Sequence, residues 1–282
     1  MANNLRVIYQ NLADTATITA SPGASGVTLV TNMQKDAKSL VYRASGTSST
    51  LTVNLASAQI VGGVILPFCN LTSTATIRVQ GFSTANGTGT QVFDTGVINA
   101  CPYQPLGMWA WGSIPLGLNM YAYGGATYGR AWLANNMQTS CLSLLITVSD
   151  TANTNGYLEF SRLVIGAYWS PKYNTGFGLS TTPKDMSEHS RSESGDIITN
   201  RGARYNTLNF DLKYMDAADR TEFTKITRGS GLPSALFISL FPDDDDPAKE
   251  QGHQIYGKLS QLGGISHPMY SIYSTTIDIE EV

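Results

Sequence analysis

The 282-residue sequence is poor in charge, because only 14% of its residues are Asp, Glu, Lys or Arg, where a soluble domain usually has about a quarter. The formal net charge of −3 argues against a general electrostatic affinity for nucleic acid. So few charges, among many glycine, serine, threonine and asparagine residues, fit two interpretations. Either neighbouring subunits cover much of the surface, or the exposed positions of a β-rich protein carry hydroxyls and amides.

Long apolar runs and cysteines are also scarce. No apolar run approaches the roughly 18–20 residues that a membrane-spanning helix needs, so we expect no membrane insertion. The first residues lack a basic segment followed by an apolar one, so we expect no secretory signal. We therefore expect the protein to be assembled in a cytoplasm. Cys69, Cys101 and Cys141 are odd in number and widely spaced, which predicts no disulfide framework. Cys69 and Cys141 lie in apolar stretches and are expected to be buried thiols.

Catalytic motifs are missing as well. The sequence has no G-x-S-x-G, P-loop, H-E-x-x-H or C-x-x-C pattern. The three histidines, His189, His253 and His267, stand in polar surroundings that favour solvated side chains. Asp243–Asp246 offers the oxygen ligands that a hard cation prefers, but a solvated acidic loop is the favoured interpretation. A glycoside-processing enzyme needs two carboxylates held across a cleft, and no spacing singles out a pair. We therefore expect no enzyme, no cofactor and no metal site.

The clearest pattern that is present lies between residues 51 and 82. It predicts three short β-strands, Leu51–Leu55, Val64–Phe68 and Ala75–Phe82. The first and third alternate apolar and polar residues, as half-buried antiparallel strands do. The middle strand is almost wholly apolar, which is typical of a strand covered on both faces. The fold class is therefore predicted to be mainly β.

This order is similar to the opening of a discoidin-type, galactose-binding-like jelly roll. The family's strand motifs L-x-V-x-L, V-x-G-V and I-R-V-x-G have their counterparts at Leu51, Val53 and Leu55, at Val61, Gly63 and Val64, and at Ile77, Arg78, Val79 and Gly81. The stretch Tyr157–Trp169 resembles the family's closing strand with its arginine and aromatic residues. The resemblance covers roughly residues 5–170 and implies a binding or scaffolding fold.

Charge changes sign near residue 170, which indicates a domain boundary. Residues 1–170 hold seven basic and five acidic residues, and residues 171–282 hold eleven and sixteen. We therefore predict a β-sandwich over 1–170 and a C-terminal α+β domain over 204–282. Between them, 171–203 is polar, punctuated by glycine and proline, and too long for an ordinary connection, which predicts a linker or an interaction arm.

The C-terminal domain has a strong helix signal. Tyr205–Tyr214 alternates as a strand, and Ala217–Arg228 follows as a helix with Asp216 as its N-cap. Three further strands are predicted at 236–241, 254–262 and 272–279, which completes a β-α-β-β-β module.

Residues 102–132 interrupt the strand pattern of the first domain with glycine, proline and aromatic residues. Six of their Trp and Tyr side chains are the candidate site residues: Trp109, Trp111, Tyr121, Tyr123, Tyr128 and Trp132. Such rings supply large contact area and a polar tip. Three interpretations stay open, namely packing inside the protein, a subunit interface, and contact with a glycan.

The chain as a whole resembles the distal tail proteins of long-tailed bacteriophages, although the sandwich comes first here and the ring module last, the inverse of that family's order. The stretches that carry the resemblance are Leu5–Tyr9, Gly62–Leu71, Arg162–Trp169, Arg204–Leu212 and Tyr256–Ser260. The resemblance implies a structural part of the virion tail, linking the tail tube to the baseplate. Its partners would be other copies in a ring, six-fold by analogy, the tube and the baseplate hub. The alternative is a receptor- or glycan-binding module that attaches the particle to a host surface.

Overall fold

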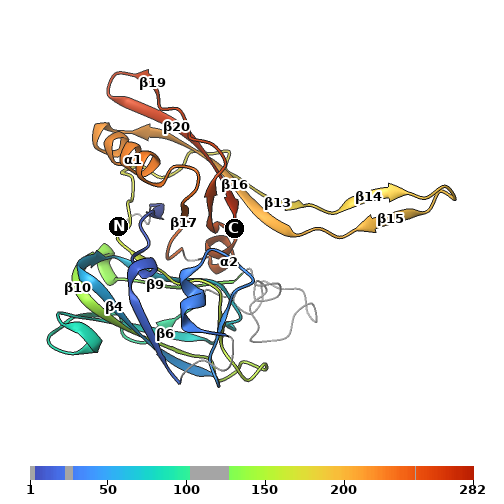
Figure 1. Ribbon diagram of the computed structural model, residues 1–282. Coiled ribbons are helices and arrows are strands. Elements are labelled where there is room, and N and C mark those ends of the chain that lie inside the picture. Colours follow the sequence, from blue (N-terminus) through green and yellow to red (C-terminus); the bar gives the residue numbers. More distant parts are fainter. Residues whose placement is uncertain (1–3, 23–27, 102–126, 245) are drawn as a thin grey trace. The chain divides into compact units, whose positions relative to one another are not determined.

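The computed structural model of the protein describes residues 4–22, 28–101, 127–244 and 246–282. The chain forms two compact units (Figure 1). Unit 1 comprises Met1–Ser170 together with Leu236–Gln254, and unit 2 comprises Pro171–Ala235 with Ile255–Val282. The first boundary falls where the sign of the net charge changes along the sequence. Leu236–Gln254, which the sequence places in the C-terminal domain, belongs to unit 1.

Unit 1 is a β-sandwich. One sheet has the strand order β2-β4-β10-β6-β7 with β8 beside β6, and the other has the order β12-β5-β11-β3 with β9 beside β5. The first sheet contains β2 (Thr17–Ser21), β4 (Ser48–Val61), β6 (Thr76–Phe82), β7 (Gln91–Asp94), β8 (Ile98–Asn99) and β10 (Thr139–Ser149). The second contains β3 (Tyr42–Arg43), β5 (Gly63–Cys69), β9 (Thr127–Trp132), β11 (Glu159–Phe160) and β12 (Val164–Gly166). Short 3-10 turns occur at Leu12–Thr15, Val30–Gln34, Ala85–Gly87 and Ala134–Asn136.

The predicted strands of the sandwich are confirmed, with wider bounds. Along β6 every second residue is buried, as expected for a strand with one face on the core and one toward solvent. All seven residues of β5 are buried. Side chains of both sheets join one apolar core, in which Val53 and Ile146 come from one sheet and Leu66 and Ile165 from the other. This buried surface is the main source of stability for unit 1.

The closing strand predicted over 157–169 is broken into β11 and β12. Between them the side chain of Arg162 is buried and pairs with Asp14 at 2.8 Å and Asp36 at 3.1 Å. A buried guanidinium needs such partners, because leaving it unpaired costs several kcal/mol. At this point the backbone is not in a strand, and the side chain of Arg162 reaches the two carboxylates.

Unit 1 also recruits a late segment of the chain. Strand β1 (Arg6–Ile8) pairs antiparallel with β17 (Ala235–Ser239), so that Val7 lies opposite Ile238. The short helix α2 (Pro247–Gly252) is held to β9 by Gln251, whose amide nitrogen donates to the carbonyl of Tyr128 at 2.9 Å. Part of the predicted β-α-β-β-β module, Leu236–Gln254, therefore belongs to unit 1. The predicted insertion 102–132 ends in a regular strand, because Thr127–Trp132 pairs with β5 as β9.

Unit 2 is built on antiparallel strands in the order β18-β20-β16-β13, with β19 beside β20. These strands are β13 (Ser180–Asp185), β16 (Arg204–Met215), β18 (Gln254–Leu259), β19 (Ser266–Met269) and β20 (Ile272–Glu281). Beyond β13 the chain continues into the hairpin β14 (Glu188–Arg191) and β15 (Ile197–Asn200). The segment predicted as an irregular linker or interaction arm therefore contains three strands, β13, β14 and β15, which make up 14 of its 33 residues.

The predicted helix is α1, Ala217–Ser230. The carboxylate of Asp216 accepts hydrogen bonds from the backbone amides of Ala218 and Asp219, as an N-cap does. Phe223 and Ile226, three positions apart on the helix, are both buried. The helix ends at Gly231, whose positive φ of 58° suits glycine. No helix among the described residues is long and apolar enough to cross a membrane.

Candidate functional site

The described part of unit 1 contains a cavity of about 580 Å³, which we call the arginine cavity. It is bounded by β1, by the β7–β8 connection, by β9 with the 3-10 turn that follows it, and by the loop after β17. Its lining residues are Arg6, Thr95, Ile98, Asn99, Arg130, Trp132, Leu133, Ala134, Asn135, Asn136 and Asp243. These elements come from distant parts of the sequence, and folding brings them together to form the cavity.

Arg6 forms part of the floor and is only 3% exposed. Its guanidinium carbon lies 4.7 Å from the ring centre of Trp132 and 5.1 Å from that of Tyr168, a cation–π arrangement on two rings. Nη1 donates to Asp243 at 3.0 Å and Nη2 to the side-chain oxygen of Asn136 at 2.6 Å. The rings and the two acceptors hold the arginine in one orientation.

Arg130 forms the second basic part of the lining. Nε and Nη2 donate to the two oxygens of Glu250, at 2.8 and 3.0 Å, and Nη1 donates to the carbonyl of Asn99 at 3.0 Å. Burial alone would lower the pKa of Arg130, but the hydrogen bonds and charge of Glu250 outweigh burial and raise it. Asp243 lies 3.9 Å from Nη2 and thus stands between the two arginines.

Three residues of the rim have left-handed backbones. The φ angles of Asn135, Asn136 and Asp243 are 56°, 57° and 55°. Asn and Asp are the non-glycine residues that adopt this conformation most readily. Backbone conformations of this kind concentrate at functional sites, because the surrounding structure must hold them in place. Here they present short amide and carboxylate groups at the cavity edge.

The charges of the cavity balance. Two guanidinium groups face the carboxylates of Asp243 and Glu250, so an ionic ligand gains no net Coulomb attraction there. What the rim offers a ligand is hydrogen bonding from Asn99, Asn135 and Asn136, whose amides carry both donors and acceptors. The arrangement suits a neutral ligand with several hydroxyl groups.

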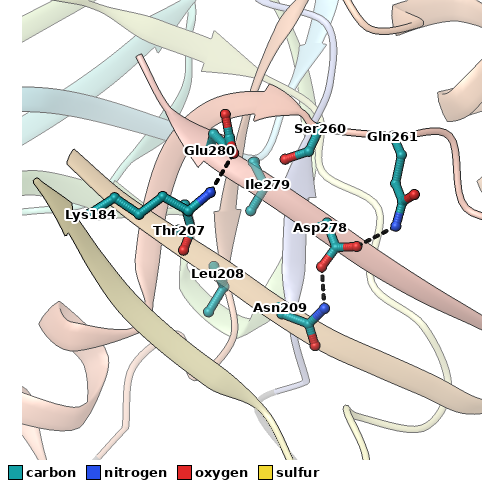
Figure 2. A pocket seen from close by; sticks show the side chains of 9 residues that line it. All are labelled: Lys184, Thr207, Leu208, Asn209, Ser260, Gln261, Asp278, Ile279 and Glu280. Atoms are coloured by element: carbon teal, nitrogen blue, oxygen red, sulfur yellow. Dashed lines mark hydrogen bonds and ion pairs between the residues drawn. The ribbon is translucent and has the colours of Figure 1, made fainter. Parts of the chain in front are cut away.

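Unit 2 has a smaller cavity of about 250 Å³ on the exposed face of its sheet (Figure 2). Its polar side chains bond to one another across the strands. Asp278 accepts from Asn209 and, at 2.5 Å, from Gln261, while Lys184 donates to Glu280 at 2.8 Å. These contacts tie β13, β16 and β20 together, and they account for the polar groups of this cavity without a ligand.

The structure places two of the six predicted site residues. Tyr128 and Trp132 are 3% and 6% exposed. Both rings lie near Phe237, at 5.9 and 6.2 Å between centres. They therefore pack inside unit 1 rather than offering a face to a glycan, although an edge of Trp132 lines the arginine cavity. Trp109, Trp111, Tyr121 and Tyr123 lie outside the described residues.

The structure also shows the surroundings of the cysteines and of the acidic loop. All three cysteines are buried and free, and burial raises the pKa of Cys141 to about 11. In the described part of the chain no group of three His, Cys, Asp or Glu side chains is arranged to hold a metal ion. The acidic loop is not simply solvated, because Asp243 pairs with Arg6 and Asp244 with Lys249 at 2.8 Å.

Sequence reasoning did not find Arg6, Asn135 or Asn136, and it treated Asp243 as part of a solvated acidic loop. The consecutive asparagines are a turn signal that fits left-handed backbone. Arg6 and Asp243 are 237 positions apart, and no local pattern connects them.

The sequence matches no family model and no curated protein sequence. Similar solved structures include a fucosidase of Ruminococcus gnavus, with 14% identity, a TM-score of 0.38 and 59% of this chain covered, over 28% of that enzyme's length. A chitosan-binding module of a Paenibacillus chitosanase/glucanase has 14% identity and a TM-score of 0.36, with 55% of this chain and 98% of that chain covered. A family 32 carbohydrate-binding module of Clostridium perfringens, in complex with galactose, has 11% identity and a TM-score of 0.35, with 56% and 98% covered. No ligand or activity is transferred from these likenesses.

Proposed function

We propose that the protein is a non-catalytic structural subunit of a larger assembly, in which unit 2 makes the subunit contacts and the sandwich of unit 1 is displayed. The observation that carries this proposal is the distribution of exposed apolar side chains. Among the described residues seventeen large apolar side chains are exposed, and eleven of them belong to unit 2, which is a third of the chain. Exposed apolar side chains mark contact sites in soluble proteins where they are contiguous, and adjacent pairs occur here at Ile197–Ile198 and Met269–Tyr270.

The finer proposal is a position at the tail end of a long-tailed bacteriophage, linking the tail tube to the baseplate. What supports it is the resemblance of the stretches around Gly62–Leu71 and Arg204–Leu212 and the need of unit 2 for partners. The expected partners are other copies in a ring, the tail tube and the baseplate hub. Cryo-electron microscopy of intact tails is the test. We expect several copies around the tail axis, and a particle that lacks the protein would refute this placement.

A second function, carbohydrate binding by unit 1, is favoured by the arginine cavity. Its balanced charge, its three amide side chains and its volume suit one or two sugar rings. Vicinal hydroxyls match the paired donors and acceptors of Asn side chains. Modules that bind chitosan and galactose are among the similar structures, but the proposal rests on the cavity.

A glycan array with defined variants tests this second function. Asn135→Gly removes an amide while keeping a residue that tolerates the left-handed backbone, and Asn99→Ala removes another. Both should abolish binding of any glycan that the wild type retains. Gln59→Ala, which alters an exposed amide on β4, is the matched control and should bind as the wild type does. Binding that depends instead on Trp109 or Trp111 would move the site to the aromatic segment, and no binding at all would remove this function.

A further inference from the structure

The hairpin that extends unit 2 has no core of its own. We call residues 180–204 the arm; it contains β13, β14 and β15, and Figure 1 shows it as a long two-stranded ribbon. Every residue of these three strands is exposed. A two-stranded hairpin is at best marginally stable in water. The arm therefore has the properties of an element that is completed by contact with another surface.

Two exposed isoleucines lie beside the polar turn at the tip of the arm, one on each face. Ile197 and Ile198 are 59% and 57% exposed. Successive residues of a strand point to opposite faces, so each face of β15 carries one isoleucine. Their cross-strand neighbours are Arg191 and Ser190, which are polar and leave both isoleucines exposed. A half-buried strand would place its apolar residues on one face, whereas this pattern fits a hairpin enclosed from two sides.

The edge of the arm resists simple strand addition. β13 is the outermost strand of the sheet of unit 2 and contains Pro183 and Lys184. Proline cannot donate to a ladder, and lysine on an edge is a common obstacle to pairing. The arm is thus suited to contact a partner through the side chains of its tip.

A matching apolar surface lies at the other end of the same sheet. In the register of β16 with β20, Thr207 pairs with Glu280 and Met215 pairs with Tyr273. The arm joins β16 at its first residue, so the β19–β20 turn lies beyond the opposite end of β16. In that turn Met269 is 68% exposed and Tyr270 is 94% exposed.

We propose that the arm tip of one copy docks on the β19–β20 turn of a second copy of this chain, burying an isoleucine on each face. This inference rests on the proposed assembly function and names its partner and contact. A chain with the two complementary surfaces at opposite ends associates head to tail, which produces a closed ring or an open filament.

Sedimentation of the full-length protein with two double variants tests the inference. The arm variant carries Ile197→Asp and Ile198→Asp, and the turn variant carries Met269→Asp and Tyr270→Asp. Each should weaken self-association by roughly 100-fold or more, as expected for loss of interface hot spots. The control Ile60→Asp alters a similarly exposed isoleucine of unit 1, 53% exposed, and should associate as the wild type does. Circular dichroism of all variants should match the wild type, because only exposed residues change.

Mixing the two variants decides the geometry. The arm variant keeps an intact turn and the turn variant keeps an intact arm, so a mixture should form heterodimers that neither variant forms alone. If the wild type associates but the mixture stays monomeric, or if either variant associates like the wild type, the arm-to-turn contact is refuted while the assembly function stands. If the wild type is monomeric up to its solubility limit, the contact is refuted, while the assembly function is still decided by microscopy of intact tails.

Discussion

Arg130 and Glu250 form a two-contact ion pair across 120 positions of the sequence, with Nε–Oε1 at 2.8 Å and Nη2–Oε2 at 3.0 Å. The side chain of Glu250 is 1% exposed and that of Arg130 is 14% exposed. Two charged groups that are buried this deeply are stable only when they pair with each other. The pair therefore fastens α2 to β9 and fixes one wall of the arginine cavity.

Glu250→Ala should destabilise unit 1 by about 3–5 kcal/mol, because it leaves the guanidinium of Arg130 buried without its carboxylate. Urea unfolding followed by circular dichroism measures the change. Glu159→Ala is the control, since the Arg43–Glu159 pair is 44% and 27% exposed and should contribute at most about 1 kcal/mol. Equal losses in the two variants would mean that burial does not govern the strength of these pairs.

Asp216→Ala should cost about 0.5–2 kcal/mol of helix stability, because two backbone amides of α1 lose their acceptor. Asp216→Asn keeps a side-chain oxygen at the cap and should restore most of that loss. Hydrogen exchange at Ala218 and Asp219 reports on the cap directly. Unchanged protection in Asp216→Ala would contradict the assigned role.

The pair of Arg78 and Asp94 should give the sandwich a pH-dependent contribution. Hydrogen bonds from Arg78, at 2.6 and 3.1 Å, hold the pKa of Asp94 at about 2, below its ordinary value of 3.8. A carboxyl whose pKa is lowered by folding stabilises the fold above its ordinary pKa, and this contribution is lost as the pH falls through about 2.

Asp94→Asn should therefore be slightly less stable than the wild type at neutral pH, by at most about 1 kcal/mol, since the pair is partly exposed. The difference should shrink as the pH falls from about 4 to about 2, because the wild type then loses the same contribution. Unfolding midpoints of both proteins across this range measure it. A difference that does not change with pH would show that the Arg78 contact is not responsible.

Gly81→Ala should destabilise the sandwich by about 1–3 kcal/mol. A methyl group at this position would overlap the ring of Phe93, which is itself 9% exposed and packed on β6, and overpacked cores lose stability by this amount. Adding Phe93→Leu should recover part of the loss. Gly264→Ala, where nothing lies within 4 Å of the added carbon, should leave the unfolding midpoint unchanged; a comparable loss there would point to backbone effects instead.

Local sequence patterns were enough to predict strands that alternate apolar and polar residues and a helix that has its own N-cap. The alternation along β6 and β16 and the cap at Asp216 identify those elements correctly. The pattern also marks 236–241 as a strand, but pairing partners are chosen by contacts between distant residues. No period in the sequence indicates that β17 pairs with β1, from a distant part of the chain.

The arginine cavity was beyond prediction for the same reason. Arg6 belongs to a short strand, Asn136 to a turn and Asp243 to an acidic loop, and each looks ordinary in its own surroundings. For Tyr128 and Trp132 the sequence leaves packing, a subunit interface and glycan contact open, and the pairing of β9 with β5 buries both residues. Aromatic composition alone does not distinguish the inside of a sandwich from its surface.

The way β1 pairs with β17 has a consequence for synthesis on the ribosome. Domains usually fold as they emerge, the N-terminal one first. Here β1 leaves the ribosome well before β17, and Arg6 waits for an acceptor 237 positions later. The nascent sandwich must therefore persist with an unpaired edge and an uncompensated charge while most of unit 2 is being made. Unit 1 begins first, but it can be completed only after α1 and β17 have been translated.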